Sequence, residues 1–173
     1  DVNNDGKPDI VVANYGAQSI SVFLNTGNGS FHSQTTYPTG TSPVSIAVAD
    51  VNGDNNPDII VANSGSNNVG ILFNLGNGAF LPPTNYTTGS TPRSVAVADI
   101  NNDGLPDIVV VNHDSNNIVI LINTSDGTFY SKITYSTGSK PTSVAISDLN
   151  SDNKPDIVVV NSASNTTSIL LHI

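Results

Sequence analysis

Four short stretches of this 173-residue chain carry most of the side chains that could bind a metal ion. The first stretch runs from Asp1 to Asp9, and the same pattern returns at 50–58, 99–107 and 148–156. Every copy has Asp at its first, fifth and ninth positions and Asn at its third. Carboxylate and amide oxygens are the ligands that calcium prefers, and calcium takes about six to eight of them. The pattern therefore predicts one calcium ion in each loop, up to four in all.

The predicted ligands are the side chains of positions 1, 3, 5 and 9 and the backbone carbonyl of position 7, where the side chain varies. Position 6 is Gly or Asn, which suits a left-handed backbone where the chain reverses. Position 8 is always Pro, which extends the chain before the next strand. We expect a structural ion, because three carboxylates this close repel one another without a cation. The predicted metal ligands are Asp1, Asn3, Asp5, Lys7, Asp9, Asp50, Asn52, Asp54, Asn56, Asp58, Asp99, Asn101, Asp103, Leu105, Asp107, Asp148, Asn150, Asp152, Lys154 and Asp156.

Other interpretations of the loops fit less well. Asp-rich Asx turns without an ion are the simplest alternative, but four copies in register with the same ligand pattern favour a bound ion. Magnesium keeps several waters and requires strict octahedral geometry. An EF-hand needs a bidentate Glu at position 12, and these loops have Val12, Val61, Val110 and Val159 there.

Strand patterns surround each loop, as the second repeat illustrates. Residues 44–49 alternate apolar and small side chains, which predicts a strand before the loop. Residues 59–62 form a continuous apolar run typical of a strand buried on both faces, and residues 69–73 predict a third strand. A Gly-Asn-Gly turn at 76–78 leads to a weaker fourth strand at 80–86. Pro82 and Pro83 mark that strand as an edge, because Pro cannot donate to a ladder.

Four short strands in each repeat of 49 residues, without helical periodicity, predict an all-β fold made of four-stranded antiparallel β-propeller blades. Residues 1–173 then form one repeat domain of about 3.5 blades, with repeats at 1–49, 50–98, 99–147 and an incomplete 148–173. The expected strand numbers are three, four, four and three. We expect the partial propeller to be completed by a longer chain or by another copy, in a ring or in a filament.

The loop pattern Asp-x-Asn-x-Asp-Gly-x-Pro-Asp, the apolar strand after it and the segments 27–31 and 76–80 together resemble the FG-GAP / VCBS repeats. These repeats are the blades of integrin-α-type β-propellers and of many secreted microbial and lower-eukaryote proteins. The third repeat departs mildly, with Ser-Asp-Gly-Thr-Phe at 125–129. The resemblance implies cation sites between the first two strands of each blade. It also implies an extracellular role in adhesion, scaffolding or the binding of a protein or glycan, and it does not imply an enzyme.

Composition excludes several other classes of function. The formal net charge is −9, and the four loops hold twelve of the 14 acidic residues. Such a surface argues against nucleic acid and against docking on anionic lipid. The chain has no Cys and no apolar run of 18 residues, so we expect neither a thiolate site nor membrane insertion. His32, His113 and His172 share no ligand spacing, and no catalytic motif is present, so we expect no catalytic residue.

Two further sets of residues are candidates for packing or modification. Tyr37, Tyr86 and Tyr135 recur at the repeat period, which predicts packing, with a repeated sugar-stacking platform as the alternative. Candidate N-glycosylation sites, each with Ser or Thr two residues on, are Asn28, Asn85, Asn123 and Asn165. The sequence therefore predicts a calcium-stabilised, extracellular, structural or adhesive propeller module that could self-assemble through its incomplete blades. A lectin-like, glycan- or protein-binding propeller is the alternative.

Overall fold

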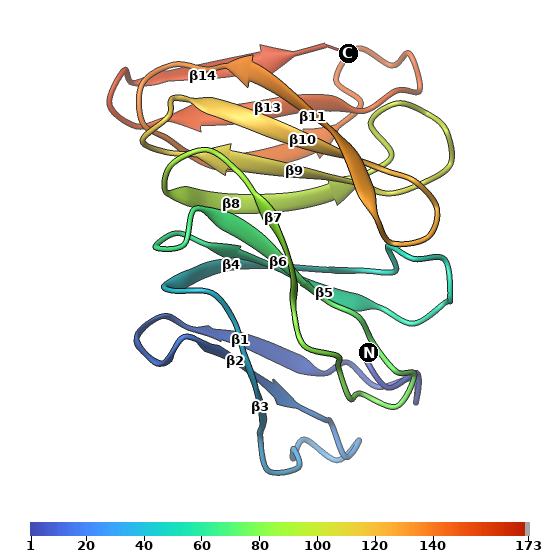
Figure 1. Ribbon diagram of the computed structural model, residues 1–173. Coiled ribbons are helices and arrows are strands. Elements are labelled where there is room, and N and C mark those ends of the chain that lie inside the picture. The colour runs from blue at the N-terminus through green and yellow to red at the C-terminus, as the bar shows by residue number, and fades with distance from the viewer. Residues whose placement is uncertain (172–173) are drawn as a thin grey trace.

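The computed structural model describes residues 1–171, except for the side chains of residues 131 and 132. Within these residues the chain forms 14 strands in four antiparallel sheets and one short 3-10 turn, Tyr15–Ala17. The sheets stack in chain order, so we number them as blades 1 to 4 (Figure 1). Among the described residues, no helix is long and apolar enough to cross a membrane.

The blades have three, four, four and three strands, as the repeat predicted. Blade 1 contains β1 (Ile10–Asn14), β2 (Ser19–Phe23) and β3 (Thr35–Pro38). Blade 2 contains β4 (Pro43–Ala49), β5 (Asp58–Asn63), β6 (Asn68–Leu72) and β7 (Thr84–Thr87). Blade 3 contains β8 (Pro92–Ala98), β9 (Asp107–Asn112), β10 (Asn117–Asn123) and β11 (Phe129–Ser136). Blade 4 contains β12 (Pro141–Ser147), β13 (Asp156–Asn161) and β14 (Thr166–Leu170).

The register between the second and third strands is the same in every blade. Ile59 pairs with Leu72 in blade 2, and residues at multiples of 49 positions from them form the matching pairs Ile10–Phe23, Ile108–Leu121 and Ile157–Leu170. Because side chains alternate between faces, this register gives every blade two apolar faces with the same arrangement of residues.

The fourth strand of blade 2 differs from its prediction. It begins at Thr84 and not at Phe80, and Phe80 makes only an isolated bridge with Asn74. Pro82 and Pro83 lie between these two points and cannot donate ladder hydrogen bonds. Blade 3 has no proline there, and its fourth strand does begin at the equivalent Phe129.

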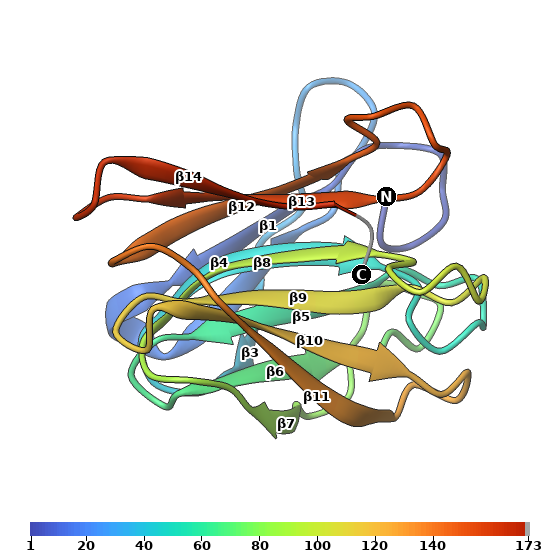
Figure 2. The ribbon, with the colours of Figure 1, turned by 90° about the horizontal axis from the view of Figure 1, so that it is seen from above.

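The core lies between neighbouring blades in three apolar clusters. All six residues of β5 are buried, and so are all six of β9, because each of these strands has a blade on both sides. The first strand β8 contacts both β4 and β12, which puts the first strands at the inner edge of the stack. The fourth strands lie at the outer edge, where β7 is largely exposed (Figure 2).

Candidate metal centre

The four acidic loops all emerge on the same side of the stack, on the right in Figure 1. In blades 2, 3 and 4 each loop joins the first strand to the second, and in blade 1 the loop leads into β1. Neighbouring loops touch, since Asn4 Nδ2 donates to Asn56 Oδ1 at 2.9 Å. The predicted ligands are therefore gathered on one side of the protein.

Inside each loop the side chains of positions 1, 3 and 5 fold around one turn of backbone. In blade 2, Asp50 accepts from the backbone N–H of Asp54 at 3.2 Å and of Asn55 at 2.7 Å. Asn52 Nδ2 donates to Asp54 Oδ2 at 3.1 Å, and Asp54 Oδ1 accepts from the N–H of Asn56 at 2.8 Å. The other three loops repeat these bonds.

Two positions of each loop have left-handed backbone. Position 6 does so as predicted, with φ of 80°, 65°, 88° and 61° at Gly6, Asn55, Gly104 and Asn153. Position 4 does so too, which the sequence analysis missed, with φ of 57°, 77°, 59° and 62° at Asn4, Gly53, Asn102 and Ser151. Gly, Asn and Ser at position 4 were the available signal, because Gly and Asn adopt this conformation most easily.

The carboxylate of position 9 has a separate task that the spacing alone did not predict. Asp58 is fully buried, and its Oδ2 accepts from the backbone N–H of Val51 at 3.0 Å. Its Oδ1 accepts from the N–H of Asn74 at 2.8 Å. Asp58 thus links the start of the loop to the segment that follows the third strand. Asp9 and Asp107 make both equivalent bonds, and Asp156 Oδ2 makes the first of them with Leu149.

The loop acids also influence each other electrostatically. Burial raises the pKa of Asp58, the N–H groups of Asn74 and Val51 oppose this rise, and the carboxylates of Asp54 and Asp50 add to it. Burial likewise raises the pKa of Asp107, and the Asp103 carboxylate adds to that rise. The pKa of the buried carboxyl thus reflects the presence of the other loop acids.

The loops fit a hard cation by the chemistry of their donors. Positions 1, 3 and 5 supply two carboxylates and one amide oxygen around one turn, and a carboxylate oxygen has room for more than one partner. Among residues 1–171, however, no three Asp, Glu, His or Cys side chains already converge closely enough to hold an ion. The structure therefore brings positions 1, 3 and 5 together and turns position 9 toward the backbone. The role of the position 7 carbonyl stays a prediction.

A recurring Asn completes the loop and was not recognised as functional from the sequence. Asn74 Nδ2 donates to the carbonyls of Pro57 at 2.8 Å and, in the previous blade, Val2 at 2.7 Å. Asn123 Nδ2 donates in the same way to Pro106 and Val51, at 2.9 Å each. The signal was Asn recurring at the repeat period directly after the third strand, at 25, 74 and 123.

This role argues against the predicted N-glycan on Asn123. The side chain of Asn123 is buried, and its nitrogen, the atom that would carry the sugar, donates both of those hydrogen bonds. Asn28, Asn85 and Asn165 are exposed, and their glycosylation stays a prediction.

The recurring tyrosines pack between blades, as predicted. Tyr37 meets Phe80 edge to face with ring centroids 5.4 Å apart, and Tyr86 meets Phe129 in the same way at 5.4 Å. Tyr135 packs against the apolar cluster between blades 3 and 4. These contacts favour packing, and the repeated sugar-stacking platform stays an untested alternative.

Three ionisable residues outside the acidic loops, His113, Asp114 and Lys140, form a polar cluster. Asp114 accepts from Lys140 Nζ at 2.7 Å and from Thr91 Oγ1 at 2.6 Å, and it lies 2.7 Å from His113 Nδ1. These partners, Lys140 first, hold the pKa of Asp114 well below its usual range. His32 is not part of this cluster and belongs to blade 1, and His172 is outside the described residues.

Comparisons with known proteins agree with this architecture. A comparison with curated proteins found no match. Among solved structures, a functionally unknown protein from Desulfotomaculum acetoxidans DSM 771 matches with a TM-score of 0.72 and 16% identity over 98% of this chain. A lectin from Agrocybe aegerita that recognises non-reducing terminal N-acetylglucosamine matches with a TM-score of 0.62 and 21% identity over 92% of the chain. A putative 6-phosphogluconolactonase from Bacteroides uniformis ATCC 8492 matches with a TM-score of 0.60 and 14% identity over 93%.

At these identities the matches establish the fold alone, a partial β-propeller. The chain spans 52%, 44% and 53% of the three matched chains, so it is about half as long as they are. The family model for the FG-GAP-like repeat matches three overlapping stretches, residues 1–61, 50–110 and 99–159. Together these stretches cover most of the sequence, and each holds two complete acidic loops with the strands between them. The chain therefore belongs to the FG-GAP-like repeat family.

Proposed function

We propose that the chain is a calcium-stabilised β-propeller module with a structural or adhesive role outside the cell. The observation that carries this proposal is the fourfold repetition of one oxygen-rich loop along the same side of the stack. In each loop, positions 1, 3 and 5 would hold the ion, together with the carbonyl of position 7 and the carboxylate of position 9. Calcium supplies charge neutralisation there, which offsets the repulsion among loop carboxylates.

The chemistry of such sites supports an extracellular setting. Oxygen-only calcium sites of modest affinity fill where free calcium is high, as it is outside cells. Outside the loops, the ion pairs of the described residues join only His113, Asp114 and Lys140, in a cluster at the surface. This arrangement supports a binding or structural module rather than an enzyme. The negative charge of the loops supports a protein or glycan partner, or a second copy, over nucleic acid.

Calcium titration of thermal unfolding tests the metal. Each site filled at a hundredfold excess over its dissociation constant adds about 2.7 kcal/mol of stability. Unfolding followed by circular dichroism should therefore shift upward by many degrees in calcium and shift back in excess EDTA. Magnesium at the same concentration should give a much smaller shift. A melting curve that is identical in calcium and in EDTA would refute the proposed metal.

A lectin-like module is the second candidate. Tyr15 and Tyr130 lie outside the packing between blades and are 62% and 73% exposed, so their rings are free to stack on a sugar. The fold is also that of a lectin that recognises N-acetylglucosamine. Binding to a glycan array that is lost in Tyr130→Ala and kept in Tyr37→Ala would favour this candidate. An array without signal would leave the structural role as the better proposal.

A further inference from the structure

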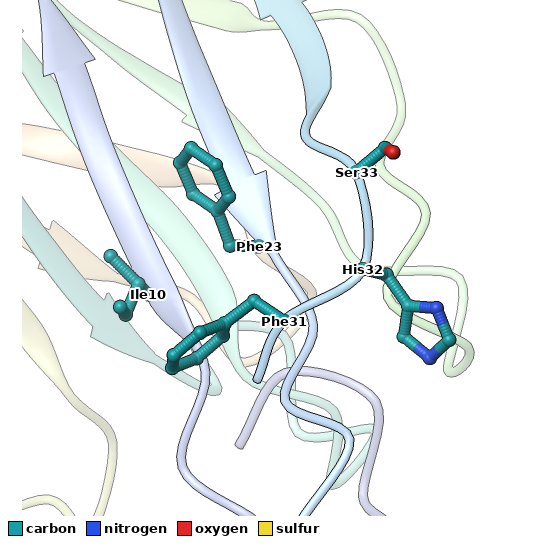
Figure 3. Close-up of a pocket in the computed structure, with 5 residues that line it drawn as sticks. All are labelled: Ile10, Phe23, Phe31, His32 and Ser33. Carbon is teal, nitrogen blue, oxygen red and sulfur yellow. The ribbon is translucent and has the colours of Figure 1, made fainter. Parts of the chain in front are cut away.

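The outer face of blade 1 is apolar and uncovered within the described chain. Ile10 and Val12 are 43% and 40% exposed, whereas the equivalent residues of blades 2, 3 and 4 are fully buried. Ile10, Phe23 and Phe31 lie close together and line a hollow of about 440 Å³, and the His32 ring points away from these three side chains (Figure 3). We call Ile10, Val12, Phe23 and Phe31 the N-terminal face.

Blade 4 has the complementary surface at the other end of the stack. Leu149, Val160 and Ile169 are 50%, 48% and 57% exposed, and we call them the C-terminal face. Their equivalents in blade 3 are covered by blade 4 and are buried: Ile100, Val111 and Ile120. The exposure of the C-terminal face thus comes from its place at the end of the stack and not from a change to polar side chains.

Inside the protein these two kinds of face always pack on each other. Ile59 and Val61 of blade 2 pack on Ile20 and Val22 of blade 1 in one cluster. In another cluster, residues of blade 4 equivalent to the N-terminal face pack on residues of blade 3 equivalent to the C-terminal face: Ile157 and Val159 on Val111 and Ile120. The chain therefore carries both halves of an interface that it already builds between its own blades.

At the same interface, one side-chain amide has a single acceptor within the described chain where its equivalents have two. Asn74 and Asn123 each donate to two carbonyls, and one of these belongs to the second loop residue of the previous blade. Asn25 is the equivalent residue of blade 1 and donates to Pro8 alone, at 2.8 Å. The matching carbonyl at the far end of the stack is that of Leu149, the second residue of the last loop.

We propose that the C-terminal face of one copy docks on the N-terminal face of a second copy, in the same relation as neighbouring blades. Asn25 Nδ2 then donates to the carbonyl of Leu149 in the second copy. Such a contact is heterologous, so every copy keeps one free face, and association continues head to tail until a ring closes or a filament grows. Burial of the two apolar faces drives it. The inference rests on the proposed self-association and specifies its surface.

Light scattering coupled to size-exclusion chromatography tests this inference, in calcium and at physiological salt so that the net charge of −9 is screened. Wild type should form species larger than a monomer whose mass rises with concentration. Ile10→Asp blocks the N-terminal face, Ile169→Asp blocks the C-terminal face, and each variant alone should be monomeric. Leu75→Asp changes an exposed residue of a turn outside both faces and should behave as wild type. Unfolding curves check that all variants fold.

Mixing the two blocked variants is the decisive measurement. Ile10→Asp keeps an intact C-terminal face and Ile169→Asp an intact N-terminal face, so the mixture should form a one-to-one dimer and stop there. A wild type that is monomeric at every concentration, or a mixture without dimer, would overturn the second copy as the occupant and favour a partner of different sequence. Self-association of both variants like wild type would show that another surface is used. None of these outcomes would affect the calcium-dependent melting of a monomer, so failure here is distinct from failure of the proposed calcium module.

Discussion

Replacing the buried acid of one loop should distinguish the stability that comes from the loop's own hydrogen bonds from the stability that comes from its ion. Asp58→Ala removes two hydrogen bonds from backbone N–H groups, those of Val51 at 3.0 Å and Asn74 at 2.8 Å. Hydrogen bonds to a charged group contribute about 1.5–3 kcal/mol each, so the gross loss is about 3–6 kcal/mol. The raised pKa of Asp58 shows that burying its charge is costly, and removing the charge recovers part of this loss. We therefore expect a net loss of about 3 kcal/mol without metal.

The matched control is Asp54→Ala in the same loop. Asp54 is exposed and its hydrogen bonds stay within the loop surface, so without metal it should cost less than about 1 kcal/mol. In excess EDTA the melting temperature of Asp58→Ala should fall by about 6–12 °C, because about 1 kcal/mol corresponds to about 2–4 °C at this size. In calcium both variants should also lose the stabilisation of that loop's ion.

Differential scanning calorimetry of wild type and both variants, in EDTA and in calcium, makes this comparison. If Asp54→Ala and Asp58→Ala lower the melting temperature equally in EDTA, position 9 has no separate structural task. If Asp58→Ala melts like wild type in EDTA, the two backbone hydrogen bonds contribute nothing measurable. Either result would refute the division of roles within the loop.

Two further predictions address sites away from the ion. Hydrogen bonds from Thr128 and then Thr124 lower the pKa of Asp126 to about 2, from 3.8. Because the folded-state pKa lies below the unfolded one, the ionised Asp126 stabilises the fold above pH 3.8, and this contribution disappears as the pH falls to about 2. The melting difference between wild type and Asp126→Asn should follow that window, and a difference that is constant with pH would contradict it. Gly89→Ala should cost about 2 kcal/mol in urea unfolding by overpacking, since its new Cβ would lie 2.9 Å from Asn112 Cβ. Gly16→Ala, with open space around it, should unfold like wild type, and equal costs would contradict the steric argument.

The sequence predicted the fold well because its signals are local and repeat four times. The buried run 59–62, the turn at 76–78 and the loop acids each recur at the same spacing, so the number of strands in every blade followed directly. The start of the fourth strand of blade 2 did not follow, because Pro82 and Pro83 were interpreted only as marking an edge strand, whereas they delay its ladder to Thr84. The contact of Phe80 with Tyr37 joins residues of different repeats, and no local pattern reveals it.

The sequence predicted the oxygen donors of the candidate site, but it predicted their arrangement in space less well. Spacing within nine residues identified positions 1, 3 and 5, whose side chains surround one turn. It could not identify the structural role of Asp58, because one of its two donors is the backbone N–H of Asn74, which lies 16 residues further on. Nor could it exclude a glycan on Asn123, since an acceptor motif is readable in sequence while the two carbonyls that occupy the amide lie in different loops.

The hydrogen bonds of the loop also determine how strongly calcium should be coupled to folding. Asp50 alone accepts from the backbone N–H groups of Gly53, Asp54 and Asn55, at 2.8, 3.2 and 2.7 Å. Together with the bonds of Asp58, these define the path of the loop before any ion binds. The blades also bury their apolar faces on one another, and the loops contribute their second residues, Val2, Val51 and Ile100, to these clusters. Small metal domains that lack such a core are unfolded without their ion. In this protein, calcium removal should instead leave a folded propeller segment that melts at a lower temperature, with its loops still turned by the backbone and its carboxylates repelling one another.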